Sequence, residues 1–153
     1  GSYDFILEKD IDENTQDLLV LRFILQPILE NAIYHGLPQG LDKEGKILIA
    51  AHIVNNKLIL TVEDNGDGMT EQQIDSILKE QVKDRKHFNG IGIPNVKERI
   101  QLFFGEEYGL AYESELGEYT RAVFTLPVIR PGESNGMQYT LTEKMEGEKN
   151  VKN

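Results

Sequence analysis

Residues 58–70 read Leu-Ile-Leu-Thr-Val-Glu-Asp-Asn-Gly-Asp-Gly-Met-Thr, and this stretch decides the fold. Its apolar first half has the composition of a β-strand. The chain then passes Asp64 and two glycines, Gly66 and Gly68, before a helical pattern begins. A carboxylate at a strand end, beside backbone that glycine permits, can receive a flat ligand with hydrogen-bond donors on its edge. Because Asp, Asn and Gly also form ordinary strand-to-helix turns, other stretches must decide between the two interpretations.

The composition of the 153-residue chain is that of one ordinary globular domain, with 39% hydrophobic and 27% charged residues. The formal net charge of −10 and the lack of a long basic run argue against nucleic acid or an anionic membrane as partner. If the ligand is an anion, this charge favours a divalent cation between ligand and protein. The absence of cysteine excludes disulfides, thiolate metal sites and thiol nucleophiles.

The ends of the chain differ in composition from its middle. Residues 1–2, Gly-Ser, are expected to be a cloning scar, which makes the chain a fragment of a longer protein. Residues 3–130 are expected to form the folded domain, and the polar residues 131–153 a disordered tail. No apolar run approaches the roughly 20 residues of a membrane helix, and no signal peptide opens the chain.

A helical pattern covers residues 21–36, with apolar residues at spacings of three and four. Pro27 falls inside it and predicts either a kink or a later helix start. Asn31 and His35 share one edge of the apolar stripe, and Glu30 lies further round. An asparagine beside a buried face needs a partner for its amide. The alternative is a surface asparagine followed by a histidine that favours the helix dipole.

The strand patterns predict two hairpins and an edge strand. One hairpin joins residues 46–54 and 57–63 through a two-residue Asn55-Asn56 turn. The other joins residues 110–116 and 119–128. The edge strand covers residues 3–11.

The segment after the glycine turn combines a short helix, a basic loop and a second glycine pair. Residues 70–73 form a capping box. Residues 79–89 are polar and basic, which predicts a mobile loop, although its charges also suit a solvated surface. Gly90 and Gly92 precede a helix, whose first N–H groups can bind phosphate. The basic loop beside this glycine pair has the features of a lid over phosphates.

Three stretches thus follow one another: Glu30-Asn31-Ala32 on a helix, residues 64–68 after a strand, and Gly90-Ile91-Gly92 before a helix. This order resembles the N, G1 and G2 boxes of the GHKL nucleotide-binding superfamily. Residues 25–36, Leu-Gln-Pro-Ile-Leu-Glu-Asn-Ala-Ile-Tyr-His-Gly, resemble one branch more closely, the LytS/YesM-type sensor histidine kinases. The same holds for residues 90–100, Gly-Ile-Gly-Ile-Pro-Asn-Val-Lys-Glu-Arg-Ile.

The resemblance implies an α/β two-layer sandwich, in which about three helices cover one face of a mixed, mainly antiparallel sheet and ATP lies between helices and lid. It assigns Asp64 to the adenine amino group, with Thr120 supporting a water there. It gives catalytic roles to Glu30 and Asn31, and Asn31 would hold Mg²⁺ against the phosphates. The residues it implies for close approach of the nucleotide backbone are Gly66, Gly68, Gly90 and Gly92.

The sequence departs from the superfamily pattern at three positions. Tyr119 replaces the second glycine of a G-x-G-T motif before Thr120. Tyr34 stands where many relatives carry a lysine near phosphate, which would either weaken affinity or shift that contact to His35 or the lid. Pro27 stands where hydrolytic members carry a carboxylate, so no general base for water is evident there. This last departure favours phosphoryl transfer to a protein over ATP hydrolysis.

The function that the resemblance implies is transfer of the ATP γ-phosphoryl to a histidine on a separate, upstream dimerisation domain of the same protein, with a response regulator as the indirect partner. The fragment is expected to be a cytoplasmic domain of a membrane-anchored bacterial protein, with no nucleic-acid partner and no membrane contact of its own. Two alternatives stay open from the sequence. One is an ATP-driven conformational module, and the other a non-catalytic module that binds nucleotide or a partner.

Overall fold

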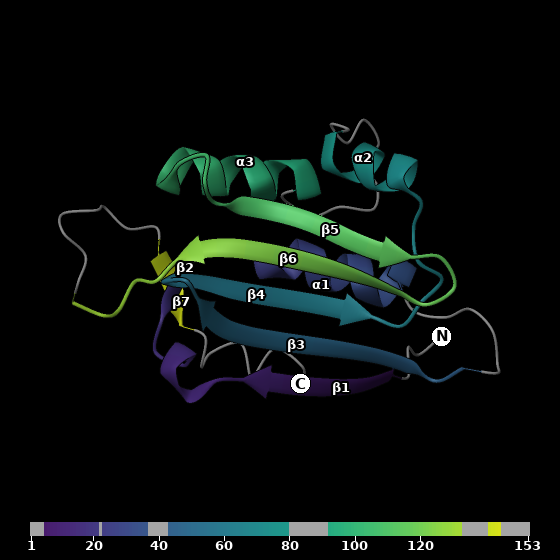
Figure 1. The fold of residues 1–153 in the computed structure, drawn as a ribbon, viewed down its shortest axis with the longest axis horizontal. Helices are drawn as coiled ribbons and strands as arrows, with labels where there is room; N and C mark the ends of the chain where they lie inside the picture. The colour runs from purple at the N-terminus through teal and green to yellow at the C-terminus, as the bar shows by residue number, and fades with distance from the viewer. Residues whose placement is uncertain (1–4, 22, 37–42, 80–91, 133–140, 145–153) are drawn as a thin grey trace.

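The computed structural model describes residues 5–21, 23–36, 43–79, 92–132 and 141–144. A five-stranded sheet in the order β1-β3-β4-β6-β5 forms its centre (Figure 1). β1 is parallel to β3, and the other neighbours are antiparallel. The mixed, mainly antiparallel sheet that the sequence predicted is therefore confirmed. Its strands are β1 (Phe5–Ile11), β3 (Gly45–Val54), β4 (Lys57–Asp64), β5 (Gly109–Glu115) and β6 (Tyr119–Pro127).

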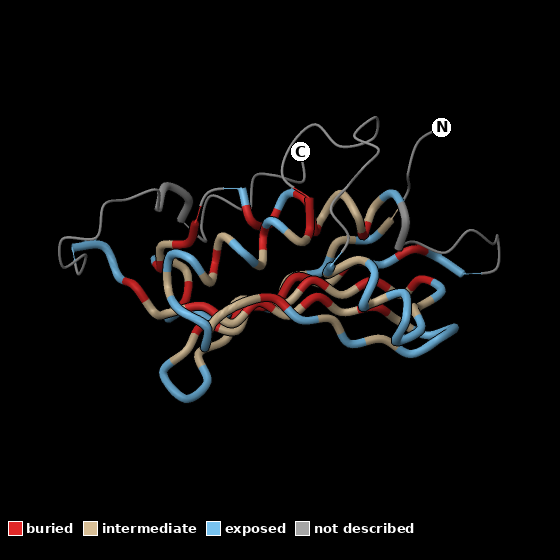
Figure 2. The backbone as a smooth tube through the Cα atoms, turned by 90° about the horizontal axis from the view of Figure 1, so that it is seen from above, coloured by how far each residue is buried: buried red, intermediate tan, exposed pale blue. Residues whose placement is uncertain are grey.

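The helices form a second layer on one face of this sheet, and the buried residues lie between the layers (Figure 2). They are α1 (Leu25–Asn31), which continues into the π-helical turn η2 (Ala32–Gly36), α2 (Glu71–Lys79) and α3 (Ile93–Phe104). Burial alternates strictly along β4 and β6, as it must when one face of a strand packs on helices. Leu60 and Phe124 from the sheet are fully buried, as is Ile100 from α3. This is the predicted two-layer sandwich.

The first helix begins later than the start of the apolar pattern. α1 starts at Leu25, which makes Pro27 its third residue. A proline in the first turn costs little, because the N–H groups there have no partner within the helix. Leu21, the first residue of the apolar pattern, lies instead in a short strand, β2 (Leu19–Leu21). Of the two interpretations of Pro27, the late start is confirmed.

A short strand from the C-terminal segment pairs with β2. β7 (Leu141–Lys144) runs antiparallel to β2 and forms a separate two-stranded sheet with it. The polar composition of residues 131–153 predicts a disordered tail, so this strand differs from the prediction. Strand pairing joins backbone groups, so a polar segment with little to bury can still form it. A 3₁₀ turn, η1 (Glu13–Thr15), lies between β1 and β2.

Two local predictions are confirmed at the level of single hydrogen bonds and torsions. Asn55 and Asn56 both have positive φ, 51° and 62°, as the tight turn of a two-residue β-hairpin requires. At the start of α2, Thr70 and Gln73 form the predicted capping box. The Gln73 N–H donates to Thr70 Oγ1 at 3.1 Å, and the Thr70 N–H donates to Gln73 Oε1 at 2.8 Å.

Candidate functional site

Three polar side chains cross the helix-facing side of the sheet where β4, β6 and β5 run together. Asp64, the last residue of β4, lies opposite Thr120 in β6, and Thr120 lies opposite Ser114 in β5. Asp64 is only 4% exposed and Thr120 only 6%. We call these three residues the inner row. Buried polar side chains are uncommon in an apolar strand and often belong to a functional site. The inner row is therefore the first candidate for a ligand-binding site.

The Asp64 carboxylate is buried without a positively charged partner. Its Oδ1 accepts the Gly66 N–H at 2.9 Å, and within the described part of the chain no ion pair reaches it. Burial raises the pKa of Asp64 to about 6, and the charges of Glu63 and Asp67 contribute to the rise, while the Gly66 N–H and the more distant charge of Lys43 oppose it. A carboxylate held near its titration point in a buried position is typical of a functional site.

Ser114 ties the glycine loop to the end of the β5–β6 hairpin. Its Oγ accepts the Met69 N–H at 2.7 Å and donates to the Tyr119 carbonyl, also at 2.7 Å. The Gly117 N–H donates to the Asp67 carbonyl at 2.7 Å. Ser114 stands where the family pattern expects it, but its role could not be predicted from the sequence, because its partners come from two other segments, the glycine loop and β6.

Gly68 is required by the packing of this loop. Its φ is +75°, a conformation that residues with a side chain rarely adopt. A Cβ atom there would lie 2.3 Å from the Glu115 carbonyl oxygen, a distance that no real contact permits. Gly66 is buried beside it. Gly92, which caps α3, is also buried but has an ordinary φ of −74°. The strict need for glycine is therefore demonstrated for Gly68.

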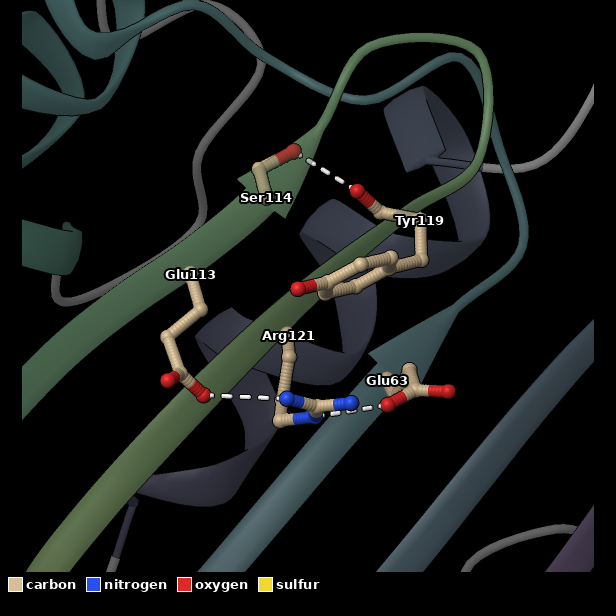
Figure 3. A network of polar contacts seen from close by, with 5 residues as sticks. All are labelled: Glu63, Glu113, Ser114, Tyr119 and Arg121. Atoms are coloured by element: carbon tan, nitrogen blue, oxygen red, sulfur yellow. Dashed lines mark hydrogen bonds and ion pairs between the residues drawn. The ribbon is translucent and has the colours of Figure 1, made fainter.

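Tyr119, the departure from the G-x-G-T pattern, leaves Thr120 in place. The Tyr119 ring lies on the other face of the sheet, 4.8 Å from the Arg121 guanidinium carbon (Figure 3). Arg121 Nε donates to Glu63 at 2.6 Å and its Nη1 donates to Glu113 at 3.0 Å. We call Glu63, Arg121 and Glu113 the outer row. Tyr119 thus packs on the outer row, and Thr120 keeps its register with Asp64.

The predicted helix residues lie at the end of α1 and in the turn that follows. The Glu30 carboxylate accepts Gln26 Nε2 at 2.9 Å. Asn31 is the last residue of α1, half-buried, and its side chain makes no hydrogen bond to any other described residue. The turn η2 packs against β4, the strand that carries Asp64. For His35, in η2, the structure describes the backbone alone.

Part of the predicted site lies outside the described residues. This holds for Gly90 and for all of the predicted lid, residues 79–89, except Lys79, which ends α2. The described structure therefore brings together Asp64, Gly66, Gly68 and Thr120, and it places Asn31 at the end of a helix whose continuation packs on the same sheet.

Fold and site together define a GHKL-type ATP-binding domain. Residues 16–130 match the family described as histidine kinase-, DNA gyrase B-, and HSP90-like ATPase, and the chain belongs to this family. The resemblance that the three boxes indicated is thereby confirmed.

The curated relatives are sensor histidine kinases. The chain is 40% identical over 118 residues to sensor histidine kinase YesM of Bacillus subtilis (strain 168), a match that covers 77% of this chain and 19% of that protein. It is 35% identical over 105 residues to sensor histidine kinase BtsS of Escherichia coli (strain K12), covering 69% of this chain and 16% of BtsS. The chain therefore spans about a fifth or less of the length of these relatives.

Solved structures of the same fold include histidine kinase catalytic domains. The catalytic domain of histidine kinase ThkA superposes with a TM-score of 0.60 at 17% identity, over 82% of this chain and 81% of that one. The histidine kinase domain of Erythrobacter litoralis EL346 gives 0.54 at 17% identity, over 81% of this chain and 52% of that one. Within the described residues, no helix has the length and hydrophobicity of a membrane span.

Proposed function

We propose that this domain binds ATP together with Mg²⁺ and transfers the γ-phosphoryl to a histidine on a separate dimerisation domain of the same protein, upstream of this chain. A response regulator then receives the phosphoryl group from that histidine. The observation that carries the proposal is the buried Asp64 carboxylate, which has no cationic partner among the described residues and lies in one row with Thr120.

The inner row suits the amino edge of adenine. A carboxylate only accepts hydrogen bonds, and an exocyclic amino group is a donor that fits it. Such a bond stabilises the charged form of Asp64, which burial otherwise disfavours. The bound base would therefore compensate for the electrostatic cost that the unliganded site carries. Thr120 supports a water beside the base in this proposal.

The phosphates would lie toward the end of α1 and the start of α3. The Asn31 side-chain oxygen is a hard ligand of the kind that Mg²⁺ prefers, and the bound ion would neutralise phosphate charge. We assign a catalytic role to Glu30 beside it. We assign a phosphate contact to His35, and close backbone approach to Gly66, Gly68, Gly90 and Gly92. The N-terminus of α3, with Gly92 as its cap, offers N–H groups and the positive end of the helix dipole.

Transfer to a protein is favoured over hydrolysis by what stands at position 27. Pro27 is buried in the first turn of α1, one helical turn before Asn31. Its ring cannot accept a proton from water, so it cannot act as a general base. Phosphoryl transfer to a protein side chain depends mainly on positioning the acceptor in line with the phosphorus. This is why we favour the kinase over an ATP-driven conformational module.

The whole protein would be anchored in a bacterial membrane, with this domain on the cytoplasmic side.

The experiment that tests the proposal incubates the 153-residue chain with Mg²⁺ and ATP labelled in the γ-phosphate. Alone, it should not label itself, because the acceptor that we propose is absent from it. Of its three histidines, the two that the structure describes lie in η2 and in β3. Adding the upstream dimerisation segment of the natural protein in trans should produce acid-labile, alkali-stable label on that segment, weakly because the tether is lost.

Two results would contradict the proposal. Acid-labile label on the chain alone would mean that one of its own histidines is the acceptor. Absence of ATP binding by calorimetry, with or without Mg²⁺, would leave a partner-binding module as the function.

A further inference from the structure

One buried hydroxyl group near the inner row has no hydrogen-bond partner. Tyr112 precedes Ser114 by two residues in β5, so both side chains lie on the helix-facing side of the sheet. The Tyr112 hydroxyl is buried and bonds to no other described residue. Burial raises the pKa of Tyr112, and the charge of Asp64 raises it further, so the phenol stays protonated within electrostatic reach of that carboxylate. A buried hydroxyl left unpaired costs free energy and requires an explanation.

The hydrogen bonds of the inner row show which groups can still donate. Ser114 has one hydroxyl hydrogen, and it is donated to the Tyr119 carbonyl. The hydrogen in the 3.1 Å contact between Ser114 Oγ and Thr120 Oγ1 must then come from Thr120. Asp64 and Thr120 consequently present only acceptors to a ligand. Among the described residues around the inner row, the Tyr112 hydroxyl is the donor that remains.

We propose that Tyr112 is a specificity-determining residue of the nucleotide site, whose hydroxyl donates a hydrogen bond to N1 of the purine ring, next to the amino group held by Asp64. This inference rests on the proposed function. In adenine the amino donor is flanked by two ring-nitrogen acceptors, N1 and N7. Guanine has a carbonyl in place of the amino group and an N–H at N1. N7 is an acceptor in both bases, so a donor distinguishes them only at N1. A Tyr112 hydroxyl at N1 beside the Asp64 carboxylate fits adenine, whereas with guanine the hydroxyl would face the N1–H and the carboxylate would face the carbonyl.

The test compares Tyr112→Phe with the unmodified 153-residue chain by calorimetry, with ATP and its 1-deaza, 7-deaza and 3-deaza analogues. Losing one neutral hydrogen bond should weaken ATP binding about 3- to 10-fold. The difference between the two proteins should vanish with the 1-deaza analogue, which lacks the acceptor, and persist with the 7-deaza analogue. It should persist with 3-deaza-ATP, because N3 lies across the ring from the amino group.

A matched control removes the same atom elsewhere. Tyr108 packs edge-on against Phe104, with Lys57 5.2 Å from its ring centre. Tyr108→Phe should leave ATP affinity unchanged. Without nucleotide, Tyr112→Phe should melt at the same or a higher temperature than the unmodified chain, since it removes a hydroxyl that has no partner. A merely structural hydroxyl would behave in the opposite way.

The outcomes separate this inference from the function on which it rests. If the unmodified chain binds ATP and Tyr112→Phe binds it equally well, the inference is wrong while the proposed function stands. An equal loss for every analogue, or a lower melting temperature of unliganded Tyr112→Phe, would also overturn it. If the unmodified chain binds no ATP, both the function and the inference are wrong.

Discussion

The inner and outer rows cross the same three strands one residue apart, on opposite faces of the sheet. In the outer row the Arg121 guanidinium lies between two carboxylates, at 2.6 and 3.0 Å (Figure 3). In the inner row Asp64 has the backbone N–H of Gly66 and no such cation. The charges of the partly exposed row are therefore paired with one another, while the buried row has a charge that no ion pair among the described residues matches. A buried group left unmatched where a neighbouring one is matched is the physical mark of a binding site.

The largest expected loss of stability comes from Gly68→Ala, which would push the glycine loop away from the end of β5. Gly68→Ala should lower the free energy of unfolding by about 3–4 kcal/mol, because it combines a left-handed residue with a clash against the Glu115 carbonyl. Gly117→Ala is the matched control, since Gly117 has a φ of +80° but open space around its Cβ position. It should lose only about 1 kcal/mol by chemical denaturation. Equal losses would mean that the close packing of the loop is unimportant.

Removing the charge of Asp64 should stabilise the unliganded protein and weaken its recognition of ATP. The pKa of Asp64 in the folded protein is about 6, above its ordinary value of 3.8. The folded state therefore holds this proton more tightly, and stability falls as pH rises from 4 to 6. The full cost, about 3 kcal/mol, remains at higher pH. Asp64→Asn removes it, so the unliganded variant should be more stable at pH 7.5, and this advantage should shrink toward pH 4.

Asp64→Asn should be more stable without ligand, but it should recognise the nucleotide less well. The amide can keep the Gly66 bond but accepts more weakly than a carboxylate and carries donors of its own. The variant should lose its preference for ATP over GTP in calorimetry. A variant that is less stable at pH 7.5 and still prefers ATP would contradict the assignment of Asp64.

Asn31 tests whether phosphate binding is separable from the inner row. Asn31→Ala should weaken ATP binding about 10-fold with Mg²⁺ present and less than about 2-fold without it, because the amide oxygen is a ligand suited to that ion. Preference for ATP over GTP should be unchanged, since the base contacts are intact. An identical loss with and without Mg²⁺ would show that Asn31 is structural.

The smallest effect is expected from the outer row. Arg121→Met should cost about 1 kcal/mol of stability, because its partners are partly solvent-exposed and screened. ATP affinity should stay within about 2-fold of the unmodified chain, since Arg121 points away from the helices. A large loss of affinity would mean that the two faces are coupled through the strands.

How much of this was predictable depends on how local each feature is. The capping box at Thr70 and the Asn55-Asn56 turn are set by residues next to one another, and both were predicted and confirmed. Asp64, Gly66 and Gly68 were predicted as site residues from the end of one strand and the superfamily motif. The structure now places them with Thr120, while their binding roles remain proposals.

The features that sequence reasoning missed depend on register between distant segments. The positions of Ser114 and Tyr112 beside Thr120 follow from the register between β5 and β6. The outer row depends in addition on the register between β4 and β6. The pairing of β2 with β7 joins residues about 120 positions apart through backbone groups, which leave no side-chain pattern to recognise. No spacing rule within one strand carries that information.

The most direct test of the account is to titrate the Asp64 side-chain carboxyl by carbon-13 NMR, with and without nucleotide. The account predicts a pKa of about 6 in the unliganded chain. Saturating ATP should lower it by about one unit or more, because the adenine amino group bonds to the charged form, whereas GTP should leave it near 6. A pKa near 3.8 without ligand, or one that ATP does not change, would contradict the claim that Asp64 is a buried, unmatched carboxylate that recognises adenine.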